Sequence, residues 1–157
     1  MLVRRAERGD LLAIGRVAHA AWWESYSGLL KGSTISGVLS QDYSPSALKR
    51  RLLAGGVMVA VNEDSVVGFA DVRVNEDHIE LTAISTDPED RRQGIGTALL
   101  EAVRALEPDL PVCANVMLGN LDSEHFYEVH GFAPGEVVHS DLCGEQVVER
   151  RWWLSPG

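Results

Sequence analysis

Long apolar stretches are missing from this sequence of 157 residues. A membrane-spanning helix needs about 20 consecutive apolar residues, and no run in the chain approaches that length. The first residues, MLVRRAERGD, become polar before the apolar core of a secretory signal could form. We therefore expect no membrane association and a cytoplasmic location.

Cysteine and positive charge are also scarce. The two cysteines, Cys113 and Cys143, allow one bridge at most, which makes no disulfide framework, so we expect two free thiols. The chain has 14 Lys and Arg residues against 23 Asp and Glu, and its formal net charge is -9. This charge repels a nucleic-acid backbone and favours a cationic small partner. We therefore expect no nucleic-acid-binding function.

Metal-ligand spacings and internal repeats are absent as well. The five histidines show no pair at i and i+4 with a glutamate between them, so we predict no metal site. No Gly-x-Ser-x-Gly turn indicates a serine nucleophile, and Cys113 within an apolar run is typical of a small buried side chain rather than an acyl carrier. Neither repeats nor a long linker divide the chain, which predicts one domain over residues 1–157.

The first third of the chain has mainly helical patterns. A short strand at LVRR precedes a helix that Asp10 can cap and that runs to about Tyr26. A weaker helical region covers residues 32–40. Ser44 as cap and the proline after it then begin another helix, which the glycine pair at 55–56 ends.

From residue 57 the apolar period changes to two. The runs VMVAV, SVVGFADVRV and HIELTAIST predict three antiparallel strands separated by two NED turns. A helix, the strand PVCANVML, a short helix opened by Asp122 and closed by Gly131, and a final hairpin follow. This order predicts an α/β fold, with a mixed sheet and helices on its faces. The last strand, VVERRWWL, either forms a dimer surface or closes the sheet.

The stretch DPEDRRQGIGTALLEAVRAL places two arginines, a glutamine and two glycines directly before a helical pattern. The start of a helix has unpaired N–H groups and a partial positive charge, and glycines there let an anion approach the backbone. A Walker loop would need a lysine, which follows neither Gly94 nor Gly96. A dinucleotide fingerprint would need a third glycine where Leu99 stands. The spacing therefore disfavours both nucleotide motifs.

The run RRQGIG, between a strand and a helix, resembles the acyl-CoA-binding loop of the GCN5-related N-acetyltransferases, Arg/Gln-x-x-Gly-x-Gly/Ala. NLDSEHFYEVHGF is similar to that family's second motif, although Ser123 stands where the family commonly has Ala and Thr86 where it has a hydrophobic residue. The resemblance covers essentially the whole chain. It implies the family's acyl-CoA N-acyltransferase fold, with two helices between the first and second strands. It also implies acetyl-CoA as cofactor and direct transfer of the acetyl group to a primary amine of a small molecule or peptide.

The resemblance further implies a bulge in the strand before the loop, and the spacing of Leu81, Ile84 and Thr86 agrees, because a regular strand cannot bury all three on one face. Tyr127 matches the phenol that protonates the leaving thiolate. Glu80 matches a strand glutamate that serves as general base in histone-modifying relatives; a water relay is the alternative. The implied cofactor contacts are Ile84, Ser85, Thr86, Arg91, Arg92, Gln93, Gly94, Ile95, Gly96, Thr97, Asn120, Ser123 and Tyr127.

The run AAWWESYSGLL lies where the family forms its acceptor wall, and it supplies Trp22, Trp23, Glu24 and Tyr26 as candidate substrate contacts. Aromatic rings and a carboxylate suit a cationic amine. Adjacent tryptophans point to different sides of a helix, so we expect at least one in the core. A polyamine, an aminoglycoside, an amino acid, and a protein N-terminus or lysine all stay open as acceptor. A non-catalytic acyl-CoA sensor or assembly module on the same fold is the alternative function.

Overall fold

The computed structural model describes residues 1–91 and 93–157, and within them seven strands form one sheet in the order β1-β2-β3-β4-β5-β7-β6. All neighbouring strands are antiparallel except β4 and β5, which are parallel. The predicted mixed sheet is therefore confirmed. The strands are β1 (Leu2–Arg5), β2 (Val57–Asn62), β3 (Ser65–Val74), β4 (Ile79–Thr86), β5 (Val112–Met117), β6 (Ala133–Leu142) and β7 (Glu145–Leu154).

Three helices precede β2, one more than the family order has. Ser44 separates the second from the third, because its hydroxyl accepts a hydrogen bond from the Ala47 N–H at 3.3 Å and Pro45 follows as the first helical residue. No helix within residues 1–91 and 93–157 combines the length and apolar character that crossing a membrane requires. The helices are α1 (Leu11–Tyr26), α2 (Gly32–Asp42), α3 (Pro45–Ala54), α4 (Ile95–Leu106) and α5 (Leu121–Val129).

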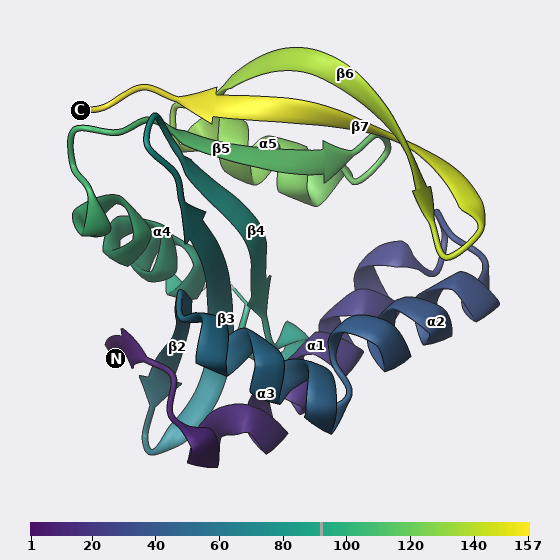
Figure 1. The fold of residues 1–157 in the computed structure, drawn as a ribbon, viewed down its shortest axis with the longest axis horizontal. Helices are drawn as coiled ribbons and strands as arrows, with labels where there is room; N and C mark the ends of the chain where they lie inside the picture. Colours follow the sequence, from purple (N-terminus) through teal and green to yellow (C-terminus); the bar gives the residue numbers. More distant parts are fainter. Residues whose placement is uncertain (92) are drawn as a thin grey trace.

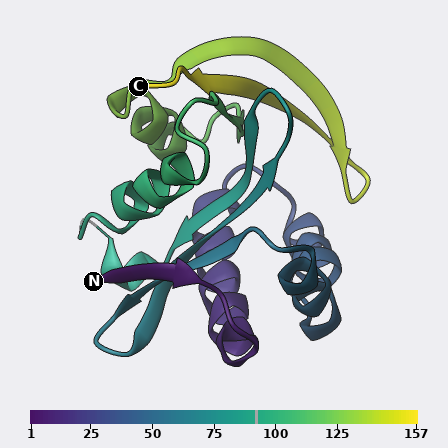
Figure 2. The same cartoon turned by 60° about the vertical axis from the view of Figure 1, so that its left-hand side comes forward.

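Helices cover both faces of the sheet (Figures 1 and 2). On one face α4 packs on β2, β3 and β4, and α5 packs on β6. On the other face α1 packs on β3 and β4, with α2 and α3 beside it. Successive residues of β3 enter different cores, since Phe69 packs with Ile14 and Val17 of α1, whereas Ala70 packs with Leu99 of α4. The sheet thus separates two apolar cores.

The hairpin of β6 and β7 reaches from the sheet to α2. Figure 1 shows it arching over β5 and ending beside that helix. At its tip the Glu145 carboxylate accepts hydrogen bonds from the Lys31 N–H at 3.0 Å and the Thr34 hydroxyl at 2.7 Å. Lys31 is the N-cap residue of α2, where a negative charge also suits the helix dipole. Glu145 therefore caps α2 from a distant strand, and these hydrogen bonds lower its pKa.

The predicted start of the first helix is confirmed, since α1 begins at Leu11 directly after Asp10, but the predicted side-chain cap is absent and the predicted start of α5 is wrong. The Asp10 carboxylate does not cap α1; it accepts from the Arg4 guanidinium at 2.8 Å and from the Glu7 N–H at 2.7 Å. These bonds tie β1 to the turn before α1 and lower the pKa of Asp10. The helix α5 begins at Leu121, before Asp122, because Asn120 rather than Asp122 provides the capping side chain.

The last strand lies inside the sheet, between β5 and β6. Trp152 is buried in the core, and the Trp153 indole donates to the Glu136 carboxylate at 3.1 Å. Both edges of β7 are therefore paired within the sheet, and β6 is the edge strand on this side. Cys113 is buried and Cys143 is exposed, and both are free thiols, as predicted.

The start of α4 leaves no room for a side chain at position 68. A Cβ added to Gly68 would stand 2.8 Å from Ile95 Cγ2 and 2.9 Å from the Ser85 carbonyl oxygen, which belongs to a paired strand. We expect Gly68→Ala to lower the free energy of unfolding by about 1–3 kcal/mol, measured by urea denaturation. A methyl group at Gly28 would meet nothing within 4 Å, so Gly28→Ala is the control. Equal stability of the two variants would contradict this packing.

Candidate active site

The strands β4 and β5 pair over three residues only. Residues 79–81 lie opposite residues 112–114, and the two strands then part. β4 goes on pairing with β3 as far as Thr86, whereas its other edge has no strand beside it beyond Leu81 in the described part of the chain. A strand edge of this kind can hydrogen-bond an extended ligand as if it were another strand.

The predicted bulge in β4 is confirmed. Asp71 of β3 pairs with Ala83 and Val72 pairs with Leu81, so Thr82 is the extra residue. The Thr82 hydroxyl donates to the Asp71 carbonyl at 2.9 Å. Because of the added residue, Leu81 and Ile84 both pack in the core beneath α4, although three positions separate them. The bulge therefore changes which side chains face the slot where the strands part.

A cavity of about 540 Å³ lies where β4 and β5 separate. Its walls come from α1, β4, the start of α4, β5 and α5. Of the predicted cofactor contacts, Gln93 does not line it, and Arg92 lies outside the described residues. The predicted contacts on the wall are Ile84, Ser85, Thr86, Arg91, Gly94, Ile95, Gly96, Thr97, Asn120, Ser123 and Tyr127.

The two glycines of the loop are needed for different structural reasons. Gly94 is the N-cap residue of α4 and has φ 76°, a left-handed conformation that glycine adopts without strain. A Cβ on Gly96 would stand 2.9 Å from the Phe126 ring, so this glycine lets α4 approach α5. The first turn of α4 leaves N–H groups without intrahelical acceptors, and it lies on the cavity wall. Together with the helix dipole, these groups can bind a phosphate.

Arg91 lines the same end of the cavity and forms an ion pair with Glu24 of α1 at 2.5 Å. Glu24 itself is not on the cavity wall. The two side chains are 37% and 44% exposed, so the pair stabilises the fold by only about 0–1 kcal/mol. An anion in the cavity can therefore compete with Glu24 for the guanidinium.

The predicted acceptor residues divide between the cavity and the surface. Trp22 and Tyr26 line the cavity with ring centroids 4.5 Å apart, and both pack against the core of α1. Trp23 is 40% exposed, lies against Gly32 and is absent from the cavity wall. The expectation that one tryptophan packs on the core holds for Trp22 alone.

Tyr127 enters the cavity from α5. Its ring is buried between Phe126 and Phe132, at centroid distances of 5.3 Å and 4.8 Å. Burial raises the pKa of Tyr127, so the phenol keeps its proton throughout the neutral range. The side chain can therefore donate a proton to a base formed in the cavity.

Asn120 joins α5 to α1 across one end of the cavity. Its side-chain carbonyl accepts from the Ser123 N–H at 3.3 Å, which caps α5. Its amide group donates to the Tyr26 hydroxyl at 3.4 Å. Asn120 is buried, and these two hydrogen bonds give both ends of its amide a partner within the protein.

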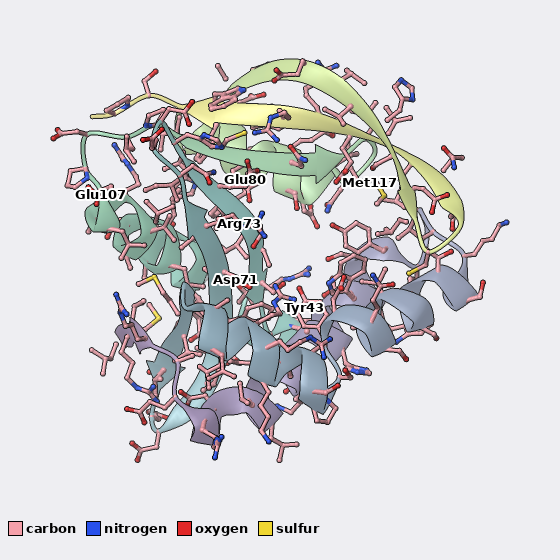
Figure 3. The ribbon with its side chains drawn as sticks, viewed as in Figure 1. Tyr43, Asp71, Arg73, Glu80, Glu107 and Met117 are labelled. Atoms are coloured by element: carbon pink, nitrogen blue, oxygen red, sulfur yellow. The ribbon has the colours of Figure 1, made fainter. Side chains whose placement is uncertain are left out.

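Glu80 lies beside the cavity rather than on its wall. Figure 3 shows it where β4 and β5 still run together, whereas Tyr43 lies across the opening beside the helices. Glu80 Oε1 accepts from Arg151 at 2.9 Å and lies 3.2 Å from His78 Nε2. Arg151 also donates to the side chain of Asn115 at 3.1 Å, and Asn115 lines the cavity. Oε1 is therefore already engaged, and Arg151 and Asn115 connect Glu80 to the cavity.

Several wall residues were not predicted. Asn115 had a sequence signal, because it interrupts the apolar run of β5 and its side chain is exposed there. Tyr43 had none, since it follows α2 and reaches the cavity only through tertiary packing. The unpredicted wall residues are Ala21, Ser25, Tyr43, Leu81, Thr82, Ala83, Asn115, Val116, Asp122, Phe126 and His130.

Comparison of the sequence with protein families shows which family the chain belongs to. The model of the Acetyltransferase (GNAT) domain matches residues 54–134, from the end of α3 to the start of β6. The chain belongs to the GNAT family. The match contains the loop before α4 and the motif around Tyr127, and this family uses acetyl-CoA. A search among curated proteins found no match to this GNAT chain.

Solved structures agree with the GNAT fold. The PaiA N-acetyltransferase from Thermoplasma acidophilum in complex with coenzyme A is 21% identical, with a TM-score of 0.78 over 95% of this chain and 96% of that one. A GCN5-related N-acetyltransferase from Rhodopseudomonas palustris is 15% identical, with a TM-score of 0.84 over 98% and 94%. A ribosomal-protein-alanine N-acetyltransferase from Brucella melitensis is 22% identical, with a TM-score of 0.69 over 98% of both chains. These similarities show a shared fold.

The double role of Asn120 can be tested by its effect on stability. Asn120→Ala removes the cap of α5 and should lower the free energy of unfolding by about 1 kcal/mol. Asn120→Asp keeps a capping oxygen but removes the donor to Tyr26, so we expect it to retain most of that stability. Thermal denaturation of both variants compares them. An alanine variant as stable as the aspartate variant would contradict the capping role.

Proposed function

We propose that this GNAT chain is a single-domain enzyme that transfers the acetyl group of acetyl-CoA directly to a primary amine of a small molecule or peptide. One observation carries the proposal: the cavity brings together the first turn of α4, the open edge of β4 and the Tyr127 phenol. Each part suits a different portion of an acyl-CoA, namely its phosphates, its amide-containing arm and its sulfur. The cavity volume of about 540 Å³ is also within the range of small-molecule sites.

In this proposal the chain holds the acyl donor mainly through its backbone. The N–H groups of residues 94–97 bind the diphosphate, and Arg91 contributes charge-assisted hydrogen bonds after leaving Glu24. The main-chain groups of Ile84, Ser85 and Thr86 pair with the arm of the cofactor. An N–H near Ile84 can stabilise the oxyanion of the tetrahedral intermediate. Acetyl-CoA supplies the thioester, and the residues supply position and proton transfer.

Tyr127 acts as general acid in this scheme. A thiolate leaving group has a pKa of about 8.5, so a nearby proton donor favours its departure. The phenol lines the cavity and is protonated at neutral pH, because the ordinary pKa of tyrosine is about 10. Burial raises the pKa of Tyr127 further. Cys113 gives no support to an acyl-enzyme route, because burial raises the pKa of this thiol to about 12 and a nucleophile must be a thiolate.

The attacking amine must lose a proton, since an alkylamine has a pKa of about 10.4. We propose Glu80 or a water relay as the acceptor. Glu80 matches the strand glutamate of the family, although it lies beside the cavity wall and Arg151 and His78 already bind its Oε1. A relay would run past Asn115, which is the cavity residue next to the Glu80–Arg151 pair.

The acceptor in this proposal is a cationic amine. The aromatic rings of Trp22, Tyr26 and Tyr43 line the cavity, and such rings attract cations. The net charge of -9 favours the approach of a cation from solution. Trp23, which lies on the surface, has no part in this wall.

Binding and turnover together test the proposal. A thermal-shift titration should show stabilisation of about 2.7 kcal/mol when acetyl-CoA reaches 100 times its Kd. Thiol release should then depend on the amine added, in a panel of polyamines, aminoglycosides, amino acids and peptides. Stabilisation without thiol release would favour the non-catalytic sensor. No stabilisation at millimolar acetyl-CoA would contradict acyl-CoA binding altogether.

Tyr127→Phe separates catalysis from binding in the same assay. It removes only the hydroxyl, so the affinity for CoA should stay within about threefold while turnover falls at least about 100-fold. His125→Gln, an exposed change on the same helix and away from the cavity wall, is the control and should keep both properties. Full activity of Tyr127→Phe would remove the phenol from the mechanism.

Glu80→Gln tests the proton acceptor. If Glu80 takes the proton, the variant should lose turnover and its pH–rate profile should shift upward, because the amine must then deprotonate in solution. Glu136→Gln is the control, since Glu136 also approaches Arg151, at 3.9 Å, but its side chain is 61% exposed. An unchanged profile for Glu80→Gln would exclude Glu80 and leave the water relay.

A further inference from the structure

His130 joins the two helices that form the phosphate end of the cavity. It follows the last residue of α5, and its ring packs on Phe126 with centroids 4.3 Å apart. Its Nε2 lies 2.8 Å from the hydroxyl of Thr97, in the first turn of α4. All three residues line the cavity. The imidazole thus contacts the turn that would hold a diphosphate.

The hydrogen bonds determine where the protons lie. Nδ1 is 2.7 Å from the Phe126 carbonyl oxygen, which can only accept, so Nδ1 carries a hydrogen. In a neutral imidazole Nε2 then has a lone pair and must accept the Thr97 hydroxyl proton. A hydroxyl has a single proton. While it is given to Nε2, the Thr97 oxygen presents only lone pairs to the cavity.

An anion at the start of α4 favours the opposite arrangement. If Nε2 gains a proton, it donates to Thr97 Oγ1, and the hydroxyl proton becomes free to donate to a phosphate oxygen. The imidazolium also adds a positive charge beside the anion. We propose that His130 is a positioning residue that takes up one proton from solvent when the CoA diphosphate binds, so that the Thr97 hydroxyl turns from repelling the phosphate to donating to it.

The charged groups around His130 belong to the cavity wall and to the two helices that it joins. Within residues 1–91 and 93–157 no ion pair involves His130. Arg91 and Asp122, of opposite charge, line the same cavity. The other titratable or charged side chains on the two helices are Glu101, Arg104, Glu124, His125, Tyr127 and Glu128.

This inference rests on the proposed function, and calorimetry tests it without turnover. CoA is titrated into the parent chain at pH 7.5 in HEPES and in Tris, whose ionisation enthalpies differ, so the difference in heat gives the number of protons taken up. We expect an uptake of roughly 0.3–1 proton, and an affinity that falls up to tenfold from pH 7 to pH 8. The phosphate monoester of CoA has a second pKa of about 6 and is nearly fully ionised throughout.

Variants assign the proton to His130. His130→Gln and Thr97→Val should each bind CoA with an uptake near zero, whereas His125→Gln on the same helix should behave as the parent chain. Thermal denaturation checks that each variant is folded. If only one of His130→Gln and Thr97→Val folds, that variant alone is enough for the test. Uptake that persists in both folded variants, or CoA binding without uptake in the parent, would overturn the role of His130. Absence of any CoA heat in the parent and in His125→Gln would overturn the proposed function instead.

Discussion

The site depends on a parallel strand pair that stops after three residues. Continued pairing would satisfy the backbone groups of β4 and leave no slot. Several features keep the strands apart: the bulge at Thr82 bends β4, Ile95 of α4 packs tightly on Gly68 of β3, and β5 pairs with β7 along its whole length. Backbone N–H and C=O groups require partners, so the exposed edge of β4 is a surface prepared for hydrogen bonding.

Helix ends supply the polar character of the cavity. In a chain with a net charge of -9, positive potential at the cavity must be local. It comes from the first turn of α4 and from Arg91, which Glu24 neutralises in the structure described here. Asn120 and His130, at the two ends of α5, connect that helix to α1 and to α4. Asn120 and His130 thus each connect two of the helices that form the cavity wall.

Features with local causes could be predicted from the sequence, and features with distant causes could not. The cap at Ser44 follows from residues near one another in the chain, and the order of apolar runs predicted the mixed sheet. The family resemblance implied the bulge in β4, and the local spacing of apolar residues agrees with it. Asp10 looked like the cap of α1, but Arg4 and the Glu7 N–H bind its carboxylate instead. The predicted cofactor contacts gather on the cavity because two short motifs contain most of them. Nothing near Glu80 in sequence indicates Arg151, its partner 71 residues away.

The bond between Glu145 and α2 has a consequence for biosynthesis. Thr34, near the start of that helix, precedes Glu145 by 111 residues. Chains fold from the N-terminus as they leave the ribosome, so α2 emerges long before the carboxylate that caps it. Until Glu145 is synthesised, the start of α2 has no capping carboxylate. Tyr43, which follows this helix, is held in place only once α2 is. The part of the cavity wall that Tyr43 forms is therefore among the last parts of the nascent chain to reach its final structure, although it is made early.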